Sequence, residues 1–273
     1  MSWWTMSMTH AEQAPGQNKR FAWLSSMRMR PRFTGFLVLV ILCLILEGLV
    51  ATGIASPSIV AAPAEMFLAL GRLFSEDSVG MAFLITLMQA IAATLLAMIV
   101  GLPLGYGLFR FELAGSAYRG WLAAMFSAPL VLLYPIFLVV IGRNYGTTIA
   151  MGFITGMIPI TLYTCEALQK VPKTLLNVGA SFHLKKAQQL WLIQIPAAAP
   201  AAFTGIRLGL IYALVNIIGI EFLIDFGGLG RLVSNMFFRY DVPGMYASIV
   251  LIILISLVLL AALNKVEKWL RPI

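Results

Sequence analysis

The stretch MAFLITLMQAIAATLLAMIVGLPLGYG, residues 81–107, contains no Asp, Glu, Lys or Arg. About 20 helical residues, rising 1.5 Å each, cross a bilayer core of roughly 30 Å. The apolar residues of this stretch form a block rather than an amphipathic rhythm, so the stretch is long and apolar enough to cross a membrane as a helix. Similar blocks recur along the chain, and the sequence therefore predicts an all-α, polytopic membrane protein.

The overall composition excludes an ordinary soluble domain, in which about a quarter of the residues are charged. Of the 273 residues, 60% are hydrophobic and only 11% are charged, and the mean hydropathy is +0.92. Too few polar groups remain to cover a water-exposed surface. The two cysteines, Cys43 and Cys165, lie in or beside apolar blocks and have no spacing typical of a metal or redox site.

Six transmembrane helices are predicted, at residues 33–52, 81–107, 120–141, 146–165, 202–224 and 245–263. Residues 1–32 are polar and basic, and we expect them to form a mobile cytoplasmic tail. The first apolar block is too long for the core of a signal peptide, so we interpret it as an uncleaved helix. Residues 33–273 are expected to form a single transmembrane permease domain.

The basic residues predict the orientation of these spans. With a cytoplasmic N-terminus, the Lys and Arg residues, 19 in all, fall on the inside except for Arg72, Arg143, Arg231 and Arg239. This bias predicts six spans with both termini in the cytoplasm. It also accounts for the net charge of +8 without a nucleic-acid partner.

Small residues and prolines mark the predicted spans. Pairs of glycines four residues apart, which let helix backbones approach closely in lipid, occur at Gly101/Gly105, Gly152/Gly156 and Gly205/Gly209. Prolines free a backbone carbonyl and kink a helix, in moving and in static bundles alike. They occur in spans 2 to 4, at Pro103, Pro129, Pro135 and Pro159.

No motif for catalysis is present. The sequence contains no G-x-x-x-x-G-K-[ST] phosphate loop, no H-E-x-x-H and no G-x-S-x-G. The carboxylates inside predicted spans, Glu47 and Glu221, lie near the outer ends of spans 1 and 5 and do not form a pair. We therefore expect no enzymatic activity, no metal site and no cofactor, with any ATP hydrolysis on a separate subunit.

The longest predicted cytoplasmic connection, residues 166–201, is the most informative. Between Thr174 and Gln194 its composition favours a helix at the inner face of the membrane, bounded by Pro172 and Pro196. Its apolar side consists of Leu175, Leu176, Val178, Phe182 and Leu184. A helix that is partly apolar and partly polar is suited to dock a partner. The alternative is a solvated loop helix without a partner.

This segment, VPKTLLNVGASFHLKKAQQLWLIQIPAAAP at residues 171–200, resembles the "EAA" loop of the transmembrane permease subunit of binding-protein-dependent ABC importers, particularly the nitrate/sulfonate/taurine-type branch. Ile195-Pro196 takes the position of the family's Leu-Pro pair. The residues that match the ending are Ala197, Ala198 and Pro200. The name-giving residues differ, because Asn177 replaces the glutamate, Val178 and Gly179 replace the alanines, and His183 replaces the glycine.

Other stretches are similar to the same family, and the resemblance covers residues 55–265. They are ATLLAMIVGLPLGYGLFRF (93–111), GFITGMIPITLYTCEAL (152–168), TGIRLGLIYALVNIIGIEFL (204–223) and GGLGRLVSN (227–235). The resemblance implies a multi-pass subunit of the bacterial inner membrane. Its implied partners are a second permease copy, two ATPase subunits, and a periplasmic or extracellular solute-binding protein.

The resemblance also implies a cytoplasmic coupling helix between spans 4 and 5, which we predict at about Leu175 to Lys186. The residues predicted to couple to the ATPase are Leu175, Asn177, Gly179, Ser181, His183, Lys185 and Lys186. Asn177, Gly179, Ser181 and His183 are expected to lie closest to the ATPase groove.

Asn216 and Glu221 are the predicted solute-path residues. Glu221 is an ionisable group at membrane depth, where such groups are functional by default, and Asn216 lies close to it in the sequence. The alternative role for Glu221 is as a structural partner of an arginine such as Arg231. The arginines outside the membrane are placed to attract a small anionic solute, or to pair with an acidic surface of the binding protein.

Two other classes of transporter remain as alternatives, a stand-alone secondary carrier and a channel. They are expected to show inverted repeats or ion-coupling residues within the spans, and neither is evident. An insertase would not need the long proline-bounded loop, and an intramembrane enzyme would need acid–base or metal-binding residues.

Overall fold

The computed structural model describes residues 31–76 and 79–270, and within these ranges every regular element is a helix. The chain divides into two units, residues 1–54 and 55–273. The first unit contains helix α2 (Pro31–Ala51), and the second contains all the other described helices. The predicted tail lies almost entirely outside the described residues, so the division into a tail at 1–32 and one domain at 33–273 stays a prediction.

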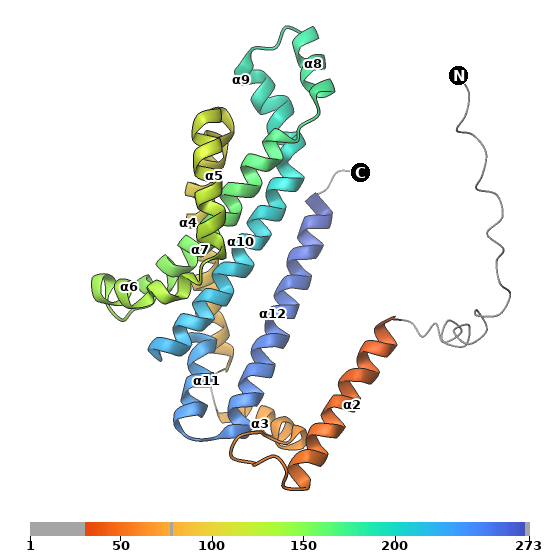
Figure 1. Ribbon diagram of the computed structural model, residues 1–273, viewed down its shortest axis with the longest axis vertical. Helices are drawn as coiled ribbons and strands as arrows, with labels where there is room; N and C mark the ends of the chain where they lie inside the picture. The colour runs from red at the N-terminus through yellow and green to blue at the C-terminus, as the bar shows by residue number, and fades with distance from the viewer. Residues whose placement is uncertain (1–30, 77–78, 271–273) are drawn as a thin grey trace, which may run out of the picture. The chain divides into compact units, whose positions relative to one another are not determined.

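Four helical segments are long and apolar enough to cross a membrane (Figure 1). They are α4 (Val79–Arg110), α7 (Tyr145–Gln169), the run containing α10 (Ile195–Ile224), and α12 (Val242–Leu270). A fifth span results if α5 and α6, described below, are taken as one bent pair. The apolar part of α2, Leu37–Ala51, is shorter than these. The described residues thus support four or five of the six predicted spans.

The core of the second unit is formed by α4, α7 and α10, with α7 packed against both of the others. The predicted glycine pairs lie at these two interfaces. A Cβ atom built on Gly105 would lie 2.7 Å from the carbonyl oxygen of Thr161, and one on Gly156 would lie 2.9 Å from that of Gly209. Backbones this close tolerate only glycine. The prediction that these glycines bring helices together is confirmed.

The predicted span at 120–141 is sharply bent in the structure, at the prolines that the sequence marks as sites of a kink. Helix α5 (Glu112–Ser127) is followed by a short 3-10 helix, η1 (Leu130–Leu133), and by α6 (Tyr134–Ile141). The segments before and after the break make an angle of 87°. Pro129 precedes η1 and removes a helical hydrogen-bond donor at the break, while Pro135 lies in the first turn of α6, where proline is tolerated.

Two helices, α3 (Pro63–Glu76) and α11 (Gly228–Phe238), lie in connections between the predicted spans. Both lie at one end of the second unit, where α4 and α7 begin and α10 ends, and α8 (Lys173–Ser181) lies at the other end (Figure 1). We call these the α11 end and the α8 end. The connections predicted to share the cytoplasmic side, 108–119 and 166–201, both lie at the α8 end.

Candidate functional site

The predicted coupling helix is in fact two helices separated by a turn. Helix α8 ends at Ser181, and α9 begins at Lys186 and ends at Gln189. A π-helical segment, η2 (Leu190–Gln194), then leads directly into α10. The prediction of one helix from Leu175 to Lys186 is therefore wrong. The helix that carries Pro196 and Pro200 begins at Ile195, seven residues before the predicted span at 202–224.

His183 explains where α8 ends. Its φ of 53° places it in the left-handed region, which non-glycine residues seldom adopt. The amide of His183 donates to the carbonyl of Ala180 (2.9 Å), and the amide of Leu184 donates to that of Gly179 (3.1 Å). This pair of bonds is a Schellman motif, whose left-handed position normally carries glycine. His183 is the residue that stands where the resembled loop has its glycine.

Replacing His183 with valine is expected to lower the stability of the protein by about 1 to 2 kcal/mol relative to a His183→Gly variant, because a β-branched residue is strained at positive φ. Thermal denaturation of the two purified variants in the same lipid nanodiscs measures the difference. Equal midpoints would contradict the left-handed assignment of this turn.

Helix α8 is fixed to the start of the long helix behind it. The side-chain amide of Gln189 donates to the carbonyl of Leu176 at 2.6 Å. Gly179 is buried, and a Cβ atom built on it would lie 2.5 Å from the Cδ1 of Ile193. The Gln188 side chain accepts a bond from the amide of Lys185 (2.9 Å), at the start of α9. These contacts hold α8 against α9 and η2.

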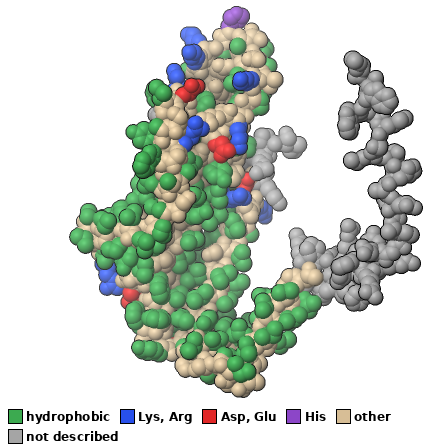
Figure 2. All heavy atoms as spheres, viewed as in Figure 1, with side chains coloured by type: hydrophobic (Ala, Val, Ile, Leu, Met, Phe, Trp, Pro, Cys, Tyr) green, Lys and Arg blue, Asp and Glu red, His purple; other side chains and the backbone are tan. Residues whose placement is uncertain are grey.

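The predicted coupling residues separate into two groups. Gly179 faces inward, against Ile193, whereas the others are exposed at the α8 end, namely Leu175, Asn177, Ser181, His183, Lys185 and Lys186. On the face shown in Figure 2, most of the Lys and Arg side chains lie toward this end, with His183 at its tip. Val178 and Phe182, which the sequence places on the apolar side of this segment but not among the coupling residues, are also exposed.

Those residues give α8 an exposed apolar face. Leu175, Val178 and Phe182 follow the i, i+3, i+7 spacing of one helix face. Phe182 is 76% exposed. Large apolar side chains grouped at a polar, basic end of a protein mark a surface for a partner. We call these three residues the α8 knob.

At the α11 end, Glu221 is the centre of a buried polar junction. The carboxylate of Glu221 is fully buried and accepts hydrogen bonds from the hydroxyl of Thr86 (2.9 Å) and the side-chain amide of Gln89 (2.9 Å), both on α4. It also accepts one from the backbone amide of Gly230 (3.0 Å), in the first turn of α11. The hydroxyl of Thr148 on α7 donates to the side-chain amide oxygen of Gln89. Four helices are joined at this junction.

The position of Gly228 and Gly230 at the start of α11 lets the backbone approach this carboxylate. A Cβ atom on Gly230 would lie 2.2 Å from the carbonyl oxygen of Ile218, and one on Gly228 would lie 1.9 Å from the carboxylate of Glu221. The negative charge at the N-terminus of α11 also complements the helix dipole. Close packing against α10 therefore explains why the Gly-Gly-Leu-Gly segment has glycine at these two positions.

The suggested pairing of Glu221 with Arg231 is not what the structure has. Arg231 instead lies 3.9 Å from the carboxylate of Asp225, and Arg143 lies 3.8 Å from that same carboxylate. Arg143 also donates to the carbonyls of Ile224 (2.7 Å) and Asp225, which end α10. Two of the arginines predicted to attract an anion, Arg143 and Arg231, are thus partly neutralised by one acidic residue.

Asn216 and Glu221 do not form one site. They are five residues apart on α10, which places them about 140° apart around the helix axis. The side-chain oxygen of Asn216 is buried and accepts no hydrogen bond within the described part of the chain. Of the two predicted solute-path residues, only Asn216 has a free polar atom.

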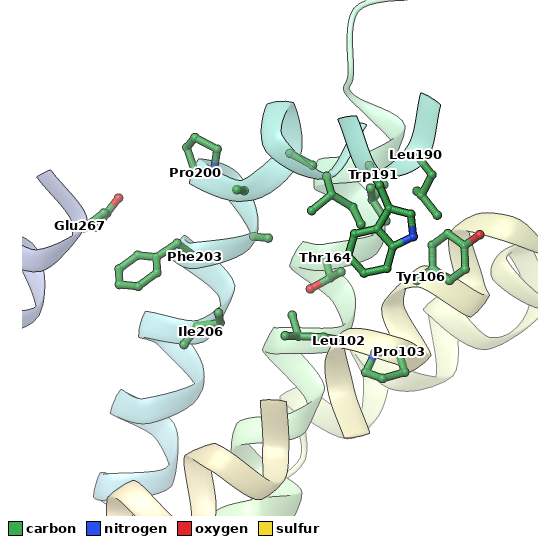
Figure 3. A pocket seen from close by; sticks show the side chains of 15 residues that line it. Leu102, Pro103, Tyr106, Thr164, Leu190, Trp191, Pro200, Phe203, Ile206 and Glu267 are labelled. Carbon is green, nitrogen blue, oxygen red and sulfur yellow. The ribbon is translucent and has the colours of Figure 1, made fainter. Parts of the chain in front are cut away.

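A cavity of about 640 Å³ lies near the α8 end, between α4, α7, α10 and α12 (Figure 3). Its walls are nearly all apolar, and include Tyr106, Trp191 and Phe203. Glu267 contributes a carboxylate, which accepts a bond from Arg207 at 2.6 Å. A site of this composition is unsuited to a small anion. Among residues 31–76 and 79–270, no group of three or more His, Cys, Asp or Glu residues is arranged to hold a metal ion.

The fold and these sites define a helical membrane protein that carries an exposed apolar knob at one end. Comparison with known families is more specific. Residues 93–272 match the family described as "Binding-protein-dependent transport system inner membrane component". The chain belongs to this family, whose members are non-catalytic transport subunits that work with a separate ATPase.

The curated relatives transport different solutes. The formylaminopyrimidine transport permease protein ThiX of Halalkalibacterium halodurans is 26% identical, over 65% of this chain and 71% of its own length. The osmoprotectant import permease protein OsmW of Salmonella typhimurium is 29% identical, over 65% of this chain and 84% of its own length. These names do not single out the nitrate/sulfonate/taurine-type branch.

A solved structure with the same fold is the inward-facing MetNI methionine ABC transporter. One of its chains superimposes with a TM-score of 0.59 at 18% identity, over 69% of this chain and 94% of that chain. The expected ABC permease fold is thereby confirmed.

Proposed function

We propose that this chain forms the solute path of an ABC importer and couples ATP hydrolysis by its partner subunit to uptake of a small solute. Membership of the binding-protein-dependent family supports a membrane subunit that requires an ATPase and a solute-binding protein. The observation that carries the coupling role is the α8 knob, an exposed apolar surface on a helix fixed to the base of α10.

The proposed coupling runs along one continuous helical rod. From Lys186 to Ile224, α9, η2 and α10 follow each other without a break, which corresponds to roughly 58 Å at 1.5 Å per residue. The knob lies beside one end of this rod, and Glu221 lies near the other. A displacement of α8 by the ATPase is thus transmitted to the junction that holds α4 and α11. Nucleotide and solute then bias the same two-state change from opposite ends.

The α8 end is proposed to face the cytoplasm. Its basic residues and the positive-inside rule support this orientation, which places the solute-binding protein at the α11 end. A sixth span formed by α2, and cytoplasmic positions for both termini, belong to the same proposal. The same proposal includes a second permease copy, two ATPase subunits and a location in the bacterial inner membrane.

The narrower proposal concerns the solute, which we propose to be small and anionic, as nitrate, sulfonates and taurine-like compounds are. Support comes from Arg143, Arg231 and Arg239 at the α11 end, although Asp225 offsets part of their charge. Asn216 supplies a free polar atom for the path. A binding screen with the cognate solute-binding protein tests this, and exclusive binding of neutral or cationic solutes would contradict it.

Replacing Phe182 with aspartate is expected to reduce co-purification of the ATPase at least about tenfold, because a charge replaces the most exposed apolar residue of the knob at a desolvated contact. The measurement is the amount of ATPase retained on affinity-tagged permease, together with solute uptake by proteoliposomes.

The matched control is Tyr240→Asp, which changes an exposed aromatic residue at the α11 end. It is expected to leave ATPase binding unchanged. Cysteines at Val178 and Phe182 are expected to cross-link to the ATPase, whereas one at the inward-facing Gly179 is not. Normal ATPase retention by Phe182→Asp would refute the coupling role of the knob. Solute uptake by the permease alone would instead favour a stand-alone carrier or channel.

A further inference from the structure

Helix α3 packs on the second unit with one narrow side only. Ala69 and Leu73 are almost fully buried, and they pack with Ala247 and Leu251 in the first turns of α12. Leu70 is partly buried against the same cluster. This side anchors α3 at the α11 end, where Figure 1 shows it beside the beginning of α12.

A second apolar side of α3 has no partner in the described part of residues 55–273. Phe67 and Phe74 are 74% and 64% exposed and lie seven residues apart, on one face of the helix. Leu68, also exposed, lies between this face and the polar side. Two exposed phenylalanines on so short a helix form an apolar surface that is unfavourable in contact with water, which indicates that something covers it.

The polar side of α3 indicates which way the helix is turned. Arg72 pairs with Asp241 at 3.4 Å, just before α12 begins, whereas the buried side of α3 belongs to a cluster that includes Ala247 and Leu251 of α12. Leu251 lies ten residues beyond Asp241, or about 15 Å along the helix axis. The polar side is therefore nearer the end of the span, and the buried side lies deeper along it.

We propose that α3 lies in the headgroup region of the bilayer at the α11 end, with Phe67 and Phe74 inserted among the lipid chains. A helix of 14 residues is too short to span a membrane, and a polar side facing water with an apolar side facing lipid is typical of interfacial helices.

Lipid is the occupant because the apolar face continues an existing lipid surface. Helix α12, on which α3 packs, is apolar enough to cross the membrane, and its exposed residues begin at the same level, at Ile249, Ile253 and Leu257. Apolar residues exposed on a spanning helix are suited to face lipid. The phenylalanines of α3 extend this surface to the interface, where aromatic rings are favoured. The inference needs only a membrane location, and does not depend on the coupling role of α8.

The test places a fluorescent thiol probe on α3 in the full chain, reconstituted in liposomes. Cys43 and Cys165 are first replaced with alanine, and single cysteines are introduced as Phe67→Cys and Phe74→Cys. Glu65→Cys is the matched control, because it lies on the polar side of the same helix. Quenching is measured with spin-labelled lipids and, separately, with aqueous iodide.

Probes at Phe67 and Phe74 are expected to be quenched by the lipid label at least about twice as strongly as the probe at Glu65, and less strongly by iodide. Iodide quenching of all three probes to the same degree would show a water-exposed helix and overturn the proposal. Protection of the Phe67 and Phe74 probes from both quenchers would show a protein cover, such as a second copy or residues 31–51, and would overturn it equally. The two phenylalanine positions serve as independent variants if one fails to fold.

Discussion

Substituting Gly230 with alanine is expected to separate the start of α11 from α10 and to abolish transport. The added Cβ atom would lie 2.2 Å from a backbone carbonyl, that of Ile218, which cannot rotate away as a side chain can. The displaced amide of Gly230 would no longer donate to Glu221. Losing a hydrogen bond to a charged group costs about 1.5 to 3 kcal/mol, and the clash adds to this cost. Solute uptake by proteoliposomes and thermal denaturation of the purified protein measure the two effects.

The matched control is Gly219→Ala on α10. A Cβ atom at this position meets no atom within 4 Å, so uptake and stability are expected to stay within error of the unmodified protein. Glu221→Ala is expected to reproduce the Gly230→Ala defect, because it leaves Thr86, Gln89 and the amide of Gly230 without their acceptor. Full uptake by both Gly230→Ala and Glu221→Ala would refute the structural importance of the junction.

A leucine at Gly105 is expected to prevent stable assembly of the core, costing about 3 kcal/mol or more. A Cβ atom there would lie 2.7 Å from the carbonyl oxygen of Thr161 and 2.7 Å from the Cβ atom of Thr164, so α4 and α7 would have to move apart. The expected observation is a severalfold lower yield of monodisperse protein after membrane extraction, with loss of uptake.

Gly107→Leu provides the comparison on the same helix. No atom lies within 4 Å of a Cβ atom at Gly107, so normal yield is expected although the substitution is identical and only two residues away. If both variants gave the same yield, the α4–α7 contact would not depend on the absence of a side chain at Gly105.

The parts of the fold that could be predicted from the sequence are those that a bilayer imposes locally. A spanning helix such as α4 appears in the sequence as a continuous apolar block. The spacing of Gly101 and Gly105 is informative because helix backbones must approach closely to associate in lipid. The EAA-like frame indicated the coupling segment because its prolines and polar residues are neighbours in the chain.

The remaining features depend on contacts that no local pattern contains. Thr86 and Glu221 are 135 residues apart, so the buried junction was visible only as a single acidic residue in an apolar block. The turn at His183 could not be predicted because histidine, unlike glycine, does not indicate a positive φ. Helix α3 was not predicted because its apolar residues lie on two sides. One side packs against protein, and the other has no partner in the described residues.

The junction at Glu221 sets a condition on how this molecule can change shape. Its carboxylate holds donors from α4 and α11 at about 3 Å, and Gln89 extends the set to α7. Sliding α10 along α4 by a single residue, about 1.5 Å, would break several of these bonds at once and leave a buried charge unsolvated. We therefore expect the four helices to keep a fixed register and to turn as one body, and we expect any flexing during transport to fall on elements that Glu221 does not bind, such as the bend between α5 and α6.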